Sequence, residues 1–235
     1  MTDSPANSLA DDIYERIKES IFDFLLVPGE RFSENQIAAR MGVSRTPVRE
    51  ALFRLRREGY IKVVPRSGWI IEPLDFQHFD ELYDVRVTLE LAAVDTLIGQ
   101  RQEEPFKRLC STWLVSEEDR ERNWRLAAQL DEEFHCGLLE AAGNRVMADM
   151  HQGVMERIRI VRRIDFIQDH RIDIAYDEHA AIIYAILAGD GSEARHLLGE
   201  HVISSRNQAR RVTLHMLNVA RERLASEQRG NESWG

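Results

Sequence analysis

GVSRTPVREALFRLRREG, residues 42–59, is the part of the sequence that says most about the fold. Its apolar positions have the i, i+3, i+4, i+7 spacing of one face of an α-helix, and they are Val48, Ala51, Leu52 and Leu55. Ser44 or Thr46 can cap this helix, and Pro47 falls in its first turn, where a missing N–H costs nothing. Gly59 is placed to end it. The stretch predicts a short amphipathic helix that carries arginines on its other faces.

The flanking residues predict a helix, a second helix and a hairpin around this element. A first helix begins near Ser8 and places isoleucines at every fourth position, until Val27-Pro28-Gly29 ends it. Ser33 and Gln36 have capping-box spacing and open a short second helix. Alternating apolar residues on both sides of Pro65-Arg66-Ser67-Gly68 indicate a β-hairpin. Residues 1–73 therefore predict a winged helix-turn-helix.

Basic residues are concentrated in the same region. Residues 40–66 contain eight basic and two acidic side chains, a net charge of +6, whereas the whole chain carries −9. Residues 1–72 are balanced, with 11 charges of each sign, so the excess of acid lies in the remainder. A local positive region is the electrostatic footprint expected for a polyanion partner, and a solvated basic helix face is the alternative interpretation.

Residues in the first turn of the 44–58 helix are the candidates for reading DNA, because a recognition helix enters the major groove N-terminus first. Arginine makes bidentate contacts with guanine, so Arg45 and Arg49 are expected to read bases. Ser44 and Thr46, with the free N–H groups at the helix start, suit phosphate. The hairpin tip offers a basic side chain and close backbone approach to the minor groove, at Arg66 and Gly68.

From Asp75 onward the sequence predicts only helices. They are expected at about 75–98, 103–116, 123–142, 144–166, 171–188 and 192–223. Gly143 and Gly189 are clear helix stops. The fold class is mostly α: an N-terminal winged helix-turn-helix, then an all-α helical-bundle effector domain over residues 74–225. Residues 226–235 are polar and predicted to be disordered.

Four residues of the helical part have the character of metal ligands. Asp131 and His135 are four residues apart, so they share a helix face. His179 and His201 each lie within the apolar stripe of their own predicted helix. One carboxylate and three imidazoles suit zinc, nickel or manganese with positions left for water or a ligand. The alternative is that these are ordinary core histidines, each hydrogen-bonded to a neighbour.

The DNA-reading residues carry a family resemblance. The run Val43 to Leu52, preceded by Gly29-Glu30 and Ser33-Glu34 and followed by Glu58-Gly59-Tyr60-Ile61, closely resembles the DNA-binding domain of the GntR family. The resemblance implies that Gly68 lies at the wing tip and that the residues contacting the operator are Arg45, Thr46, Pro47 and Arg49. Some members carry a base-reading arginine at the start of the second helix, where this chain has Asn35.

The helical part resembles the C-terminal domain of FadR-type GntR regulators, known as the FCD domain, in its six-helix VanR-like branch. In many such domains a matching aspartate and three histidines bind a divalent metal, which implies that role for Asp131, His135, His179 and His201. Arg86 and Glu90 match a recurrent Arg-x-x-x-Glu pattern, which implies that Arg86 holds a carboxylate near the metal. A salt bridge of Arg86 with Glu90 or Asp131 is the alternative, and Arg159, Arg162 and Arg163 are further candidates to face the cavity.

Together these expectations describe a transcription regulator, by default a repressor, that binds a short DNA palindrome as a homodimer and responds to a small organic acid at a metal site. A metal sensor, a structural metal and a metallohydrolase are the alternatives, and no H-E-x-x-H signature supports hydrolysis. The chain contains no apolar run of about 18 residues and no signal-peptide pattern, and its two cysteines fit no zinc or redox motif. We therefore expect a cytoplasmic protein that does not contact membranes and is not an enzyme.

Overall fold

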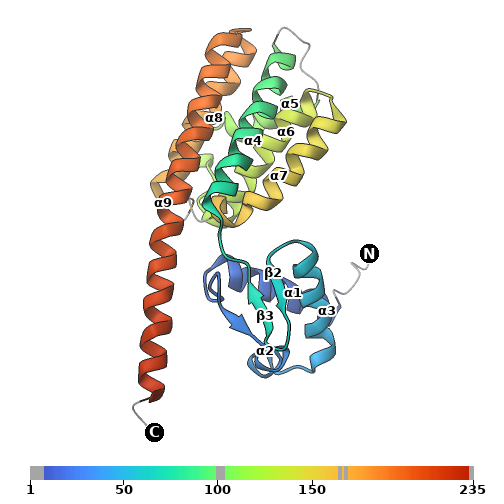
Figure 1. Ribbon diagram of the computed structural model, residues 1–235. Coiled ribbons are helices and arrows are strands. Elements are labelled where there is room, and N and C mark those ends of the chain that lie inside the picture. Colours follow the sequence, from blue (N-terminus) through green and yellow to red (C-terminus); the bar gives the residue numbers. More distant parts are fainter. Residues whose placement is uncertain (1–7, 99–103, 164–165, 167–168, 233–235) are drawn as a thin grey trace. The chain divides into compact units, whose positions relative to one another are not determined.

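The computed structural model describes residues 8–98, 104–163, 166 and 169–232 (Figure 1). Contacts divide the chain into two compact units. The first contains residues 1–74 together with 214–235, and the second contains residues 75–213. Helices dominate both units, and strands occur only in the first among the described residues. The expected fold class, mostly α with an N-terminal winged helix-turn-helix and a helical C-terminal domain, is confirmed.

The first unit contains three helices and a small sheet. Its elements are α1 (Leu9–Phe22), β1 (Arg31–Phe32), α2 (Glu34–Met41), α3 (Arg45–Arg57), β2 (Ile61–Val64) and β3 (Gly68–Ile71). The antiparallel sheet has the order β1-β3-β2. The hairpin was predicted but β1 was not, because a two-residue strand is too short to show alternation of apolar and polar residues.

Local capping explains where the helices of the first unit begin. Ser8 and Ser33 both form reciprocal capping boxes, with Asp11 and Gln36 respectively. Ser44 is the N-cap residue of α3, although its side chain makes no capping hydrogen bond. The apolar face predicted for α3 is fully buried and fixes this helix against α1 and α2. The first turn of α3 therefore lies on a rigid support.

Gly68, where the wing turns back into β3, cannot carry a side chain. Its φ of +89° lies in the left-handed region. A Cβ atom at this position would lie 2.6 Å from the main-chain oxygen of Phe32, directly before α2. The wing tip therefore packs closely against the residues that precede α2, and Arg66, at φ +64°, is exposed at that tip.

The second unit is built from six α-helices among its described residues. They are α4 (Phe76–Leu97), α5 (Glu104–Trp113), α6 (Trp124–Ala141), α7 (Arg145–Arg163), α8 (Asp169–Leu187) and α9 (Gly191–Glu232), with a short 3-10 helix η1 (Glu117–Asp119). Gly143 and Gly189 adopt positive φ after α6 and α8, as expected of helix stops. None of the described helices is long and apolar enough to cross a membrane.

The C-terminal helix differs from the sequence-based expectation in two respects. α9 continues to Glu232, so the prediction that residues 226–235 lack regular structure is wrong for 226–232; residues 233–235 lie outside the described part. The part of α9 from Leu214 onward groups with the first unit, although it was predicted to belong to the second domain. The polar composition of this stretch suggested disorder, but a helix can continue through polar residues once a preceding turn is formed.

Candidate functional site

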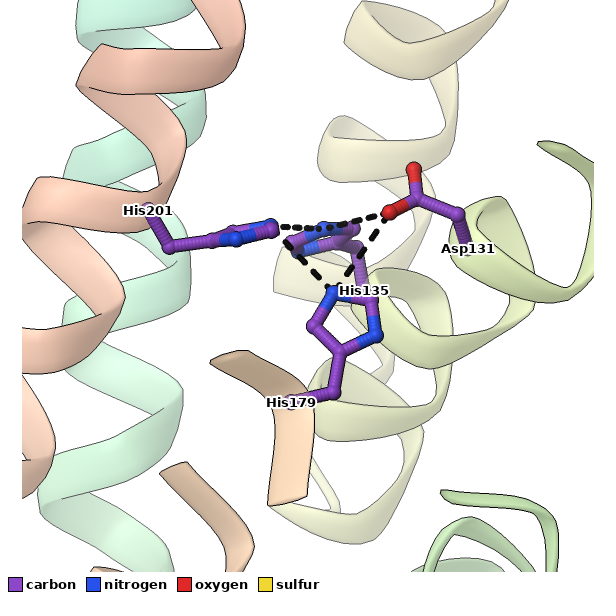
Figure 2. A group of neighbouring side chains, drawn as sticks. All are labelled: Asp131, His135, His179 and His201. Carbon is purple, nitrogen blue, oxygen red and sulfur yellow. Dashed lines mark hydrogen bonds and ion pairs between the residues drawn. The ribbon is translucent and has the colours of Figure 1, made fainter. Parts of the chain in front are cut away.

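The four candidate metal ligands meet in the core of the second unit. Asp131 and His135 come from α6, His179 from α8 and His201 from α9, and their side chains point toward one another (Figure 2). One ligand atom from each residue lies within 4.8 Å of the others, and all four residues are buried. Residues from three separate helices are thus brought to one point.

The separations of the ligand atoms suit a single ion. Nε2 of His201 lies 3.2 Å from Nε2 of His179 and 3.2 Å from Nε2 of His135. Oδ1 of Asp131 lies 3.4 Å from Nε2 of His179 and 3.8 Å from Nε2 of His135. Zinc ligands lie about 2.0–2.2 Å from the ion, so neighbouring ligands are separated by roughly 3.3 Å in a tetrahedral site.

Two carboxylates, one buried and one half-buried, orient two of the imidazoles. Nδ1 of His135 donates to Glu90 Oε2 at 2.8 Å, and Nδ1 of His201 donates to Glu178 Oε2 at 2.7 Å. A neutral imidazole carries one proton, so both Nε2 atoms hold lone pairs. These lone pairs face each other at 3.2 Å with no proton between them. A cation would fit this arrangement.

The protonation states also suit metal ligands. Burial lowers the pKa of His135 to about 3, with a further contribution from the charge of Arg86. Burial lowers the pKa of His179 well below its usual value. Burial raises the pKa of Asp131, but Arg162, which donates to Oδ2, and the nearby imidazoles outweigh this and leave the pKa lowered. At neutral pH the site therefore contains an ionised carboxylate and uncharged imidazole rings at His135 and His179.

Aromatic packing fixes the ring of His179. Phe134 stacks on it, with ring centroids 3.7 Å apart and planes inclined by 14°. Trp113 meets it edge to face, with a centroid distance of 4.1 Å. Nδ1 of His179 has no hydrogen-bond partner among the described residues. Packing thus holds the ring of His179, whereas hydrogen bonds to carboxylates hold the rings of His135 and His201.

Glu90 connects the ligand cluster to Arg86. Its two oxygens accept from Arg86 Nε at 2.6 Å, from His151 Nε2 at 2.9 Å and from His135 Nδ1. The salt bridge that was the alternative role of Arg86 is therefore formed, with Glu90. The two terminal nitrogens of Arg86 are nevertheless buried without a hydrogen-bond partner in the described part of the chain. Unpaired donors of a fully buried guanidinium are costly, and an anionic ligand would satisfy them.

Sequence reasoning missed two residues that surround the cluster, Glu178 and His151, and it named Arg162 without identifying its partner. Glu178 directly precedes His179 but points to His201 instead. His151 occupies the apolar stripe of α7, so the criterion that selected His179 and His201 applies to it as well. Of the three arginines considered for the cavity, Arg162 contacts Asp131, whereas Arg159 pairs with Glu132 and Glu156.

The candidate DNA-reading residues of the first unit are accessible. Arg45 and Arg49 have side chains that are 62% and 59% exposed, and Ser44 and Thr46 are exposed at the start of α3. A shallow hollow of about 200 Å³ lies between α2, α3 and the wing. Its lining comprises Ser33, Glu34, Asn35, Arg45, Arg49, Gly68 and Trp69. The structure thus brings the first turns of α2 and α3 and the wing residue Gly68 to one surface.

One acidic residue interrupts this basic surface. Glu34, the first residue of α2, accepts hydrogen bonds from Arg45 Nη2 and Arg49 Nε, both at 3.1 Å. Its side chain is only 13% exposed. Burial raises the pKa of Glu34, but the two arginines outweigh this and leave the pKa lowered, so the carboxylate is ionised at neutral pH.

Comparison with known protein families covers both units. Residues 9–71 match the family described as bacterial regulatory proteins, gntR family, and residues 81–204 match the FCD domain. The HTH-type transcriptional regulator YdhC of Bacillus subtilis is 30% identical over 213 residues, which are 89% of this chain and 92% of that protein.

Solved structures have the same fold. McbR/YncC of E. coli aligns with a TM-score of 0.60 at 19% identity, over 88% of this chain and 99% of that chain. A structure described as the metal-free FCD domain of TM0439 aligns with a TM-score of 0.50 at 20% identity, over 60% of this chain and 98% of that chain.

Proposed function

The chain belongs to the gntR family of bacterial regulatory proteins and carries an FCD domain, and from this we propose that it is a repressor whose DNA affinity is controlled by a small organic acid. Its relatives and both of its domains are those of transcriptional regulators, not enzymes. The proposed acid binds beside a divalent metal in the FCD domain, a domain that can bind metals. The observation that carries the proposal is the convergence of Asp131, His135, His179 and His201, together with the unpaired nitrogens of Arg86, which is joined to His135 through Glu90.

We propose that the protein binds a short palindromic operator as a homodimer. One winged helix buries too little surface for tight specific binding, and a two-fold dimer doubles the contact. Arg45 and Arg49 read base edges in each half-site, while Ser44, Thr46 and Pro47 contact the backbone. The wing residues Arg66 and Gly68 approach the minor groove. A stable monomer with full operator affinity at micromolar concentration would contradict this arrangement.

Replacing Arg66 with alanine is expected to weaken binding to all DNA sequences by a similar factor. The side chain is exposed at the wing tip, where it contributes charge rather than base recognition. Losing one phosphate contact per subunit reduces the salt dependence, with a change of about 0.9 in the slope of log K against log salt for each contact. Binding isotherms at several salt concentrations, on a specific and a scrambled duplex, measure both quantities. A selective loss on the specific duplex would place Arg66 among the base readers.

The metal site is proposed to hold zinc, nickel or manganese. Asp131 Oδ1 and the Nε2 atoms of the three histidines are the ligands, and Glu90 and Glu178 set the orientation of two of the rings. Such carboxylate partners raise ligand basicity and strengthen metal binding. When bound, the ion would supply a positive charge, and an ion that takes five or six ligands would leave positions for an anionic ligand beyond these four.

Charge balance indicates what class of effector fits. Among the ionised groups around the cluster, the positive charges balance the negative ones in three ion pairs: Arg86 with Glu90, Arg162 with Asp131, and Arg171 with Glu178. A divalent ion adds two positive charges in a site shielded from water, where uncompensated charge is expensive. A small carboxylic acid offsets this excess positive charge. It contacts the metal and also the two unpartnered terminal nitrogens of Arg86.

Replacing Arg86 with lysine or alanine is expected to leave metal binding intact and to weaken binding of the acid by about 1.5–3 kcal/mol, because a charge-assisted hydrogen bond is lost. Lysine retains a charge for Glu90 without the forked terminal nitrogens. The experiment is a thermal-shift screen of small carboxylic acids on metal-loaded wild type, followed by titration of the best acid into both variants. If wild type and Arg86→Lys bound the acid with equal affinity, Arg86 would not be part of the effector site.

Coupling between the two sites is proposed to run through the chain connections. The link between the units at Pro73 and Leu74 is short. α9 carries His201, and its part from Leu214 groups with the DNA-binding unit. A shift of α9 on ligand binding changes the freedom of the DNA-reading heads, which makes the two sites allosterically coupled.

A further inference from the structure

Glu34 is an acidic side chain in the middle of the surface assigned to DNA. We propose that Glu34 determines DNA-sequence specificity, by holding Arg45 and Arg49 in position for bases and by keeping both away from phosphates. The observation is that one carboxylate accepts from both arginines at 3.1 Å. This inference rests on the proposed reading of DNA by α3, and it adds a positioning residue that itself need not touch a base.

The carboxylate of Glu34 is held more firmly than its partners. Glu34 is the first residue of α2, directly after Ser33, whose capping box with Gln36 fixes the local backbone. Its side chain is 13% exposed, against 62% for Arg45 and 59% for Arg49. Surface ion pairs usually contribute little because two flexible side chains must be ordered. Here one partner is ordered already, so the pair acts as an anchor for the two long arginine side chains.

The atoms used in these hydrogen bonds leave the arginines able to recognise guanine. Glu34 accepts from Nε of Arg49, so the two terminal nitrogens of Arg49 point beyond the pair. It accepts one proton of Nη2 of Arg45, which leaves the second proton of Nη2 and both protons of Nη1. Two N–H groups of one guanidinium are what the O6 and N7 acceptors of guanine require. Each arginine can therefore contact a base while it remains bound to Glu34.

The negative charge of Glu34 also opposes non-specific binding. A phosphate and a carboxylate compete for the same guanidinium groups, and like charges repel. Without this carboxylate the arginines gain freedom to follow the phosphate backbone of any duplex. Loss of Glu34 should therefore raise non-specific affinity while it lowers specific affinity. A residue that only supports the fold would lower both affinities together.

The test uses the full-length chain and two probe duplexes: one selected from a random library by the wild-type protein, and a scrambled version of it. For Glu34→Gln we expect the affinity for the scrambled duplex to rise about 3-fold to 10-fold, because one repelling charge is lost per subunit. The affinity for the selected duplex should fall by about 10-fold, because two base-reading side chains lose their anchor. Glu34→Asp keeps the charge but not the reach, so it should lower specific affinity and leave non-specific affinity unchanged.

Glu50 supplies a matched control. It is an exposed glutamate on α3, and no hydrogen bond links it to Arg45 or Arg49. Glu50→Gln removes the same charge, so it should change the affinity for both duplexes by a similar factor and leave their ratio within about 2-fold of wild type. This control distinguishes an effect that depends on where Glu34 lies from an effect of losing one negative charge.

Three outcomes overturn the role of Glu34. They are an unchanged specificity ratio in Glu34→Gln at unchanged melting temperature, an unchanged ratio with both affinities and the melting temperature lowered, and an equal ratio change in Glu50→Gln. A wild-type protein that enriches no sequence from the library would instead contradict the proposed reading of DNA. In the supporting outcome the ratio falls by roughly 30-fold to 100-fold, the product of the two expected changes, at unchanged melting temperature.

Discussion

Replacing His179 with alanine is expected to abolish metal binding and the response to the acid, while the first unit still folds. His179 is fully buried and supplies one of the four ligand atoms. Losing one of four ligands leaves a site that is too weak to hold the ion at ordinary concentrations. An ion present at 1,000 times its dissociation constant stabilises the folded state by about 4 kcal/mol. We therefore expect the melting temperature of the second unit to fall by roughly 10 °C relative to the loaded wild type.

His196 is the matched control for this variant. It lies on α9, the helix that carries His201, but it is exposed and belongs to no ligand cluster formed by the described residues. His196→Ala should bind metal and melt like wild type. Wild type stripped of metal by a chelator should melt near the temperature of His179→Ala. The variant should melt slightly lower, because alanine leaves a cavity beside Phe134. Elemental analysis and thermal melts in the presence and absence of chelator measure both effects.

A purified wild-type protein that contains no metal, and that takes up none of zinc, nickel or manganese, would contradict the coordination scheme. Unchanged melting temperatures on adding and removing the metal would do the same. In either case the three histidines would be core residues, held by Glu90, Glu178 and aromatic packing alone.

Replacing Arg45 or Arg49 with alanine is expected to cause the largest loss of operator binding. A bidentate contact with guanine contributes about 1–3 kcal/mol, and a dimer loses it in both half-sites, which gives a loss of roughly 2–6 kcal/mol in total. The affinity for the selected duplex should therefore fall by a factor of about 30 or more. Affinity for the scrambled duplex should fall far less, since only a general electrostatic contribution is removed.

Arg57 provides the comparison for these two variants. It is an exposed arginine in the last turn of α3, at the opposite end of the helix from Arg45 and Arg49. Arg57→Ala removes the same charge and should reduce the affinity for both duplexes by a similar, small factor. If Arg49→Ala left the affinity for the selected duplex unchanged, the first turn of α3 would not be the base-reading element.

The fold was predictable from the sequence because its decisive features are local. The apolar face of α3, the capping box at Ser33 and the stops at Gly143 and Gly189 each depend on residues a few positions apart. One error concerns an element whose stability comes from a distant partner, and the other concerns a helix end that continues through polar residues. β1 contains two residues and exists because it pairs with β3, and the end of α9 is helical despite a polar sequence. Such elements carry no periodic pattern that the sequence alone would reveal.

The candidate metal ligands were found from their spacing and their positions on helix faces, but Glu178 and His151 beside them were not, and neither were the partners that Glu90 has on three helices. Glu90 accepts from side chains on α4, α6 and α7, and this arrangement depends on how the helices pack. Glu34 is separated by 11 and 15 residues from the arginines that it holds. Sequence spacing identifies neighbours on one helix, whereas contacts between helices require the three-dimensional structure.

The central claim is that metal and acid together control DNA binding, and one titration tests it most directly. The affinity for the selected duplex is measured by fluorescence anisotropy as the acid from the screen is added to metal-loaded and to chelator-stripped protein. We predict that the acid weakens DNA binding by roughly 10-fold with loaded protein, within the usual range of allosteric coupling, and has no effect on stripped protein. An equal effect of the acid on stripped protein, or a DNA affinity that follows the metal alone, would contradict the account.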